Sequence, residues 1–169
     1  MWVGSCNAAK DLDWLTSNGI THILNVTAKG QVRNYYEDKF EYCRCDCEDL
    51  MDAKIEDHFD KAFEFLRSAV KAQGKVLVHC RAGRSRSCTL CIGFGMCQAM
   101  TLRQAHEAVS SRRTNIQLNI GFQTKLMNLE KKMLKVEENS FDFFPPRKCK
   151  RSKKWDFSAR ASVRYDDED

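Results

Sequence analysis

The stretch Val76-Leu77-Val78-His79-Cys80-Arg81-Ala82-Gly83-Arg84-Ser85-Arg86-Ser87 decides how this chain folds. Its apolar, β-branched start predicts a buried strand that ends at a cysteine. A tight loop with one glycine follows, and an arginine stands where a helix would begin. Backbone N–H groups of such a loop point inward, and the helix N-terminus adds partial positive charge. We therefore predict an anion site that is formed by Arg81, Ala82, Gly83, Arg84, Ser85 and Arg86.

Cys80 would lie directly beneath a phosphate-sized anion in this loop. The same positive field stabilises a thiolate, and thiols in such places have pKa values of about 3.5–7.5. Arg86 could bind two phosphate oxygens at once, which a lysine cannot do. A lone Cys-x5-Arg arises often by chance, and a buried cysteine is usually inert packing. Because strand, His-Cys, glycine and Arg-Ser occur together here, we interpret Cys80 as a nucleophile.

The segments around this stretch predict an α/β fold. The pattern alternates strands with helices, which favours a single central, mostly parallel sheet of about four to five strands flanked by helices. Apolar positions from Ile55 to Val70 recur at helical spacing, and Cys43, Cys45 and Cys47 alternate as in a strand. The expected helices span residues 11–17, 55–70, 88–100, 102–110 and 119–136, and the expected strands span residues 20–27, 40–47 and 75–78.

Size and composition favour one folded domain. The chain has 169 residues, of which 43% are hydrophobic and 30% charged. Its longest apolar stretch, residues 88–100, is shorter than the roughly 20 residues that a membrane span needs, so no span is predicted. Nine cysteines are an odd number, and the first residues do not resemble a signal peptide. We expect free thiols in a reducing compartment, with a cytoplasmic or nuclear location.

The composition changes after residue 144. Both prolines are at 145–146, and residues 145–164 hold eight Lys or Arg against one acidic residue. The chain then closes with Asp166-Asp167-Glu168-Asp169. We predict a folded domain over residues 1–144 and a basic, then acidic tail over 145–169. The basic segment suits a docking or nuclear import partner, and a merely solvated tail is the alternative.

The motif His79-Cys80-x5-Arg86-Ser87 resembles the signature of the cysteine-dependent protein tyrosine phosphatase superfamily. The chain is most similar to the dual-specificity branch, in particular to the catalytic domains of atypical dual-specificity and MAP kinase phosphatases. The resemblance spans about residues 2–135 and includes Ile23-Leu24-Asn25-Val26 and the segment from Asn119 to Glu130. Leu118 stands where the family usually has proline. The chain starts inside the family's usual opening motif, which suggests a trimmed N-terminus.

The resemblance implies a domain over residues 1–144 with the cysteine-phosphatase fold, and roles for further residues. The family's general acid lies some seven residues after a strand tyrosine and ten before a phenylalanine. Counting from Tyr42 and Phe59 gives Asp49, with Asp46 and Asp52 as rivals. Three further roles follow: Ser87 helps the thiolate to leave, His79 orients the loop and supports the thiolate, and Asn25 braces the loop.

The activity implied by the resemblance is hydrolysis of phosphotyrosine and phosphoserine or phosphothreonine in proteins, without metal or cofactor. The expected partner is a phosphorylated protein, for example a protein kinase, and no nucleic acid partner and no membrane span are expected. The alternatives are a phosphatase of phosphoinositides or phosphatidylglycerophosphate, because Arg81 and Arg84 also resemble that branch, and a catalytically silent phosphate-binding module.

Two other cysteine patterns point to different chemistry. Cys88 and Cys91 have the Cys-x-x-Cys spacing of redox pairs, but both lie in an apolar helix where ordinary core is the better interpretation. Cys43, Cys45 and Cys47 with His58 have the residue types of a zinc site. Alternate residues on one face of a strand lie about 6–7 Å apart and do not converge tetrahedrally. No metal site is predicted.

Overall fold

A computed structural model describes residues 1–143 of the chain. Its centre is a parallel sheet of four strands in the order β1-β4-β2-β3. The strands are β1 (Trp2–Gly4), β2 (His22–Asn25), β3 (Glu41–Arg44) and β4 (Val76–His79). Every residue of β2 and β4 is buried, as expected for central strands covered on both faces. The predicted α/β fold is therefore confirmed.

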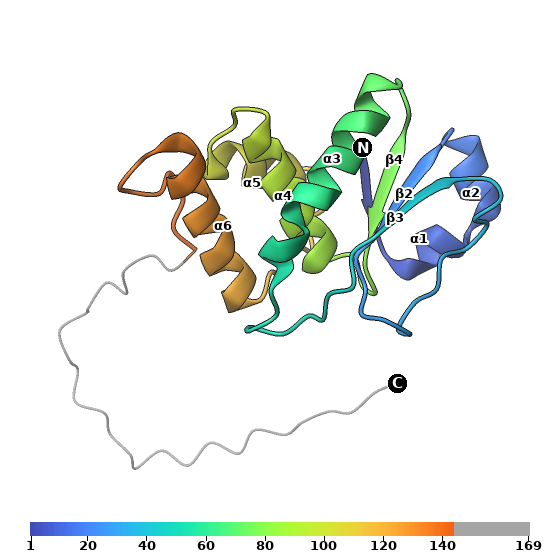
Figure 1. Cartoon of the computed structure of the whole chain (residues 1–169), viewed down its shortest axis with the longest axis horizontal. Helices are drawn as coiled ribbons and strands as arrows, with labels where there is room; N and C mark the ends of the chain where they lie inside the picture. Colours follow the sequence, from blue (N-terminus) through green and yellow to red (C-terminus); the bar gives the residue numbers. More distant parts are fainter. Residues whose placement is uncertain (144–169) are drawn as a thin grey trace, which may run out of the picture.

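Helices cover both faces of the sheet (Figure 1). One face is covered by the short helices α1 (Cys6–Lys10) and α2 (Leu12–Ser17). The 3-10 helix η1 (Ile55–His58) and the helices α3 (Phe59–Lys71), α4 (Arg86–Cys97), α5 (Leu102–Ser110) and α6 (Ile120–Leu134) lie on the other side.

Neighbouring strand residues pack into two different core clusters. Ile23 and Leu77 pack with Ala9 and Leu15 from the side of α1 and α2. Leu24 instead joins the larger cluster that includes Phe63 and Leu66 of α3 and Leu90 of α4. Successive side chains of a strand point to opposite faces, so each face of the sheet packs against a different set of helices.

Three expectations from the sequence were wrong or incomplete. Strand β1 and helix α1 were not predicted, because segments of three and five residues are too short to display a period. Helix α4 ends at Cys97 and not at residue 100, where Ala99 with φ 63° turns the chain toward the next helix. Val70 is 61% exposed, and Ala69 holds the buried position instead.

The N-termini of α5 and α6 carry the predicted caps. Thr101 forms a capping box with Gln104 at the start of α5. Asn119 accepts a hydrogen bond from the N–H of Phe122 and so caps α6. Helix α6 ends at Leu134, two residues before the predicted end, and Lys135 adopts the left-handed conformation there with φ 53°.

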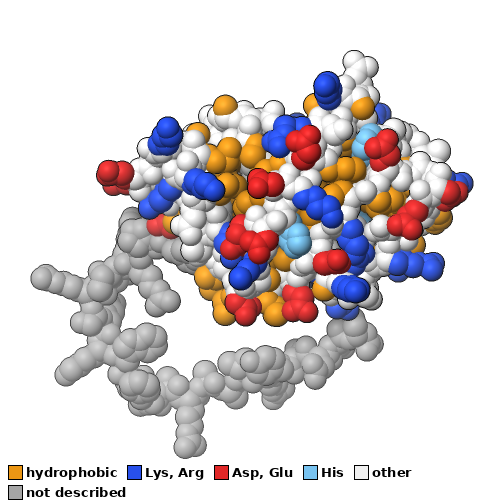
Figure 2. Space-filling model, in the orientation of Figure 1, with side chains coloured by type: hydrophobic (Ala, Val, Ile, Leu, Met, Phe, Trp, Pro, Cys, Tyr) orange, Lys and Arg blue, Asp and Glu red, His pale blue; other side chains and the backbone are white. Residues whose placement is uncertain are grey.

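The described surface mixes charges of both signs, and Figure 2 shows hydrophobic side chains between α6 and α3. A groove of about 520 Å³ lies there, lined by Phe59, Phe63 and Leu129 among others, and no residue of 79–87 lines it. Within residues 1–143, no helix is both long and apolar enough to cross a bilayer. The predicted tail over 145–169 lies outside the described residues.

Candidate functional site

The site lies where strands β2 and β4 end side by side. Asn25 and His79, the last residues of these two parallel strands, are partners in the sheet register. Ligands bind at the carboxyl ends of strands in open α/β sheets, because connecting loops meet there. Cys80 follows β4 directly, and Arg86 is the first residue of α4. The structure thus places the predicted anion loop at this edge of the sheet.

Hydrogen bonds from outside the loop hold its carbonyl groups. The carbonyl of Arg81 accepts from the N–H of Cys6 at 3.1 Å, and that of Arg84 accepts from the N–H of Gln117 at 3.0 Å. Arg113 donates to the carbonyls of Ala82 and Gly83. With these carbonyls turned away from its centre, the loop presents N–H groups to its interior, which is the arrangement that binds anions.

Gly83 is required by the shape of this loop. Its φ of +68° lies in the left-handed region that favours glycine. A Cβ atom there would lie 2.4 Å from the backbone oxygen of Gly4 in β1. The backbone N–H of Gly83 donates to Cys80 Sγ at 3.2 Å. Strand β1, which the sequence pattern did not predict, therefore packs directly against the loop that surrounds Cys80.

Cys80 is 1% exposed, and its thiol lies within hydrogen-bond distance of both Gly83 and Ser87. Burial opposes ionisation of the thiol, but hydrogen bonds from the hydroxyl and backbone of Ser87, the charge of Arg86 and the N–H of Gly83 outweigh it. The pKa of Cys80 is therefore lowered below its ordinary value. Ser87 Oγ lies 3.3 Å from Cys80 Sγ. These contacts supply the environment of a nucleophilic thiolate.

Arg86 is 3% exposed, and its guanidinium is held on one side. Its Nη1 donates to Gln31 Oε1 at 2.7 Å and to the carbonyl of Cys47 at 3.0 Å. Its Nε is buried and has no hydrogen-bond partner in the structure. Asp49 Oδ2 lies 3.6 Å from Nε, close enough for an ion pair but too far for a hydrogen bond. An anion above Cys80 would satisfy this donor.

Asp49 is the carboxylate that the structure brings to the site. Its Oδ1 accepts hydrogen bonds from Ser85 Oγ at 2.7 Å and from Asn119 Nδ2 at 2.8 Å. Its Oδ2 lies 3.6 Å from Arg86 Nε, and the side chain is 34% exposed. The carboxylate therefore borders the anion loop and is open to an incoming substrate.

The two rival carboxylates lie elsewhere. Asp46 forms a salt bridge with Arg44 at 2.6 Å. Asp52 lines a separate cavity together with His58 and Lys54. Among the three predicted candidates, only Asp49 contacts residues of the anion loop in the described structure.

His79 is completely buried at the end of β4. Burial lowers its pKa to about 4, so the imidazole is neutral at pH 7. Its Nδ1 lies 3.4 Å from the carbonyl of Cys80, and its Nε2 has no hydrogen-bond partner. The side chain can therefore orient the backbone at Cys80, but it adds no positive charge.

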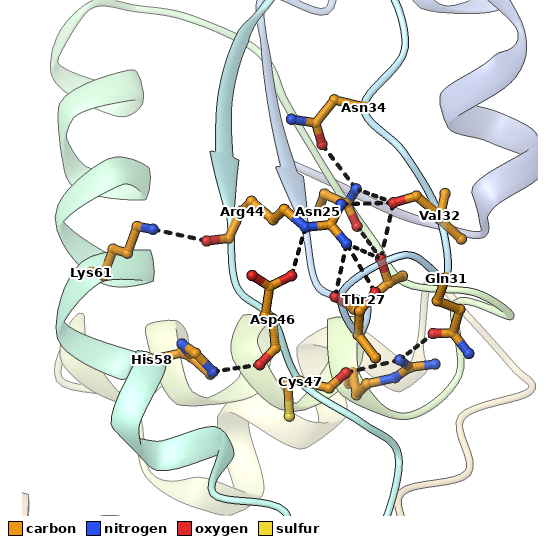
Figure 3. A network of polar contacts seen from close by, with 12 residues as sticks. Asn25, Thr27, Gln31, Val32, Asn34, Arg44, Asp46, Cys47, His58 and Lys61 are labelled. Carbon is orange, nitrogen blue, oxygen red and sulfur yellow. Dashed lines mark hydrogen bonds and ion pairs between the residues drawn. The ribbon is translucent and has the colours of Figure 1, made fainter.

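Asn25 belongs to a neighbouring network at the same edge (Figure 3). Its Nδ2 donates to the carbonyl of Val32 at 3.2 Å and to Asn34 Oδ1 at 2.9 Å. Thr27 Oγ1 in turn donates to Asn25 Oδ1 at 2.7 Å. Asn25 thus holds the segment after β2, and this segment, not the anion loop itself, is what it braces.

Three residues of the site were not predicted. Arg113 and Arg44 look like ordinary surface arginines in the sequence, and Gln31 lies in a polar connection without any motif. The two arginines contact backbone carbonyls, and Gln31 contacts Arg86. Such contacts form between segments that are distant in the sequence and meet only in the folded chain. No signal in the single sequence could have identified them.

Replacing Ser87 by alanine should raise the pKa of Cys80, because hydrogen bonds from Ser87 favour the thiolate. The thiolate would then form only at higher pH. We expect the acidic limb of the kcat/KM profile to move to higher pH, which a pH series with an aryl phosphate measures. An unchanged acidic limb with full binding would contradict this role of Ser87.

Cys88 and Cys91 are both buried in α4, and burial raises the pKa of Cys88 to about 12. Burial also raises the pKa of Cys91. Both thiols are thus unlike the exposed, acidic thiol that begins a redox pair. Within residues 1–143, no group of three or more His, Cys, Asp or Glu side chains has the arrangement of a metal site.

Known proteins resemble this chain over the same region. The family described as "Dual specificity phosphatase, catalytic domain" matches residues 1–132. "Dual specificity protein phosphatase 2" of Mus musculus is 38% identical over 136 residues, which are 79% of this chain and 42% of that protein. "Dual specificity protein phosphatase 1" of Arabidopsis thaliana is 37% identical over 144 residues, which are 85% of this chain and 71% of that protein. The chain thus spans less than half of the mouse relative.

A solved structure has the same fold. The human "tyrosine phosphatase-like serine/threonine/tyrosine-interacting protein" has a TM-score of 0.73 at 31% identity, and the match covers 78% of this chain and 91% of that chain.

Proposed function

This chain belongs to the dual specificity phosphatase family, and on that premise we propose that it hydrolyses phosphotyrosine and phosphoserine or phosphothreonine in proteins. The reaction proceeds through a cysteinyl-phosphate intermediate on Cys80. The observation that carries this proposal is the buried Cys80 thiol with a lowered pKa beneath a loop whose Arg86 Nε has no hydrogen-bond partner. Nucleophile, anion site and acid come together at one edge of the sheet.

In the first step, the Cys80 thiolate attacks phosphorus and the bond to the leaving oxygen breaks. The N–H groups of the loop and Arg86 stabilise the charge on the equatorial oxygens. Asp49 donates a proton to the leaving alkoxide or phenoxide. Its position beside Ser85 and Arg86 supports this role, because a phosphate held by the loop would place its ester oxygen near the carboxyl group.

In the second step, water attacks the phosphorus of the cysteinyl phosphate, and the S–P bond breaks. Asp49, now deprotonated, accepts a proton from this water. Ser87 Oγ, 3.3 Å from Sγ, donates a hydrogen bond that stabilises the departing thiolate. The products are inorganic phosphate and the original thiolate. No step needs a cofactor.

The expected partner is a phosphorylated protein, such as a phosphorylated protein kinase. A cavity of about 410 Å³ beside the loop supports a peptide substrate, since it could accept a neighbouring side chain. It is lined by Asp49, Arg84 and Ser85, and by Met51 and Ile120 at its apolar side. We propose a cytoplasmic or nuclear location, and a docking or import role for the basic segment within 145–169.

One assay series tests the proposed function. The purified chain and its Cys80→Ser variant are given a phosphotyrosine peptide, a phosphothreonine peptide and phosphoinositides, with chelator present. We expect wild-type turnover of both peptides and none by the variant. Much faster hydrolysis of phosphoinositides than of either peptide would show that the substrate is a lipid and not a protein. Tight binding without any turnover would indicate a silent phosphate-binding module.

The exposed arginines Arg81 and Arg84 on the loop predict a preference for substrates with additional negative charge. Replacing both by alanine should weaken binding of a doubly phosphorylated peptide more than binding of a singly phosphorylated aryl ester. Salt screens exposed charges, so the difference should shrink as ionic strength rises. Titrations at low and high salt measure this. An equal loss of affinity for both ligands would show that these side chains do not interact with the second phosphate.

A further inference from the structure

The segment between β2 and β3 brings Gln31 to the catalytic arginine. A turn forms at its start, where the N–H of Gln31 donates to the carbonyl of Ala28 at 3.0 Å. Gly30 within this turn has φ +78°, a conformation that other residues rarely adopt. The turn is exposed to solvent, yet the side chain of Gln31 reaches inward to Arg86 (Figure 3).

Arg44 of β3 fixes the backbone on both sides of Gln31. Its Nη2 donates to the carbonyl of Ala28 at 2.9 Å, and its Nη1 donates to the carbonyl of Val32 at 2.7 Å. Asn25 of β2 adds a second bond to the carbonyl of Val32. Hydrogen bonds from two sheet strands therefore hold this exposed turn in place.

The contact between Gln31 and Arg86 limits how the guanidinium can turn. A terminal guanidinium nitrogen carries two hydrogens, and on Nη1 both have acceptors, Gln31 Oε1 at 2.7 Å and the carbonyl of Cys47 at 3.0 Å. Nε is buried without a hydrogen-bond partner and lies 3.6 Å from Asp49 Oδ2. The two acceptors thus hold Nη1 and leave the N–H groups of Nε and Nη2 for another acceptor.

We propose that Gln31 is a positioning residue for Arg86. It holds Nη1, so that the other nitrogens of the guanidinium can face a phosphate above Cys80. A neutral amide suits this task because its oxygen accepts a hydrogen bond without cancelling the charge that the phosphate needs. This inference rests on the proposed phosphate site, but it concerns the orientation of one arginine and does not depend on which substrate carries the phosphate.

Three variants of the full chain test the proposal. Gln31→Met keeps the length of the side chain and removes the acceptor, whereas Gln31→Glu keeps the acceptor and adds a charge. Asp38→Met is the matched control, since Asp38 is an exposed residue of the same connecting segment. Calorimetry with inorganic phosphate gives the Kd of each variant, and thermal unfolding gives its Tm.

We expect the phosphate Kd of Gln31→Met to rise about 10-fold, because a hydrogen bond to a charged group is lost from the preorganised site. The Tm should fall only modestly, because Gln31 itself is exposed and one Nη1 hydrogen of Arg86 loses its acceptor, and the variant should remain folded in the binding assay. Gln31→Glu should bind phosphate more weakly than wild type, although it restores the contact, since its carboxylate neutralises Arg86. Asp38→Met should match wild type.

A spectroscopic signature separates positioning from a merely structural contact. The Nε–H signal of Arg86, assigned by its absence in Arg86→Lys, should be sharp in the wild type and broadened in Gln31→Met. A phosphate Kd for Gln31→Met within about two-fold of wild type, or an equal loss in Asp38→Met, would overturn the proposal. Phosphate binding is read without turnover, so a chain that binds phosphate and hydrolyses nothing would contradict the proposed function alone.

Discussion

Cys80→Ser is expected to lower kcat on the order of 10⁶-fold, the size of loss seen when a covalent hydrolase loses its nucleophile. A serine hydroxyl is not ionised at neutral pH, and nothing in the site provides a base strong enough to activate it. The loop carbonyls stay held by Cys6, Arg113 and Gln117, so the N–H groups keep their direction. Turnover of an aryl phosphate measures the loss.

Phosphate binding by Cys80→Ser should be unchanged or tighter. The variant keeps Arg86 and removes the negative charge of the thiolate, which repels a dianion. Calorimetry with inorganic phosphate checks this point, and a wild-type Tm shows that the fold is intact. A serine variant with near wild-type turnover would contradict the assignment of Cys80 as the nucleophile.

Asp49→Ala is expected to lower turnover of alkyl phosphoserine and phosphothreonine peptides about 10²–10⁴-fold, the usual contribution of a positioned general acid. An alkoxide leaves poorly without a proton. Substrates with acidic leaving groups depart unprotonated, so their first step should change much less. The values of kcat/KM for a phosphothreonine peptide and for a nitrophenyl phosphate, which report the first step, measure the two losses.

The rival carboxylates provide matched controls for Asp49. Asp46 is paired with Arg44, and Asp52 lines another cavity, so alanine at either position should leave the leaving-group dependence unchanged. If Asp46→Ala or Asp52→Ala shows the selective loss on alkyl substrates and Asp49→Ala does not, the assignment of the acid is wrong.

Much of the fold could be predicted from the sequence because its main elements carry their own signals. The central strands are apolar runs, and α5 and α6 begin at residues that cap helices. Strand β1 carries no such signal, since three residues become a strand only through their pairing with β4. The end of α4 was missed because the apolar residues Ala99 and Met100 follow Cys97 after a single polar residue. The helix stops there because Ala99 adopts the left-handed conformation.

The candidate site was predictable where its residues lie close together in the sequence. Cys80, Arg86 and Ser87 belong to one short segment whose local geometry suffices to bring them together. Asp49 required a count from a family resemblance, because it is distant in sequence and meets Ser85 only in the folded chain. Gln31 and Arg113 act through contacts that have no local pattern, so only the three-dimensional structure identifies them.

The most direct measurement of the central claim is to trap the covalent intermediate. In Asp49→Ala, a nitrophenyl phosphate still supports the first step, whereas the second step lacks its base. The cysteinyl phosphate should therefore accumulate. Rapid acid quenching followed by peptide mass spectrometry should find one phosphoryl group on Cys80, and none in the double variant that also carries Cys80→Ser. Continued turnover without phosphorylated Cys80, or a phosphoryl group on another residue such as His79, would contradict the account.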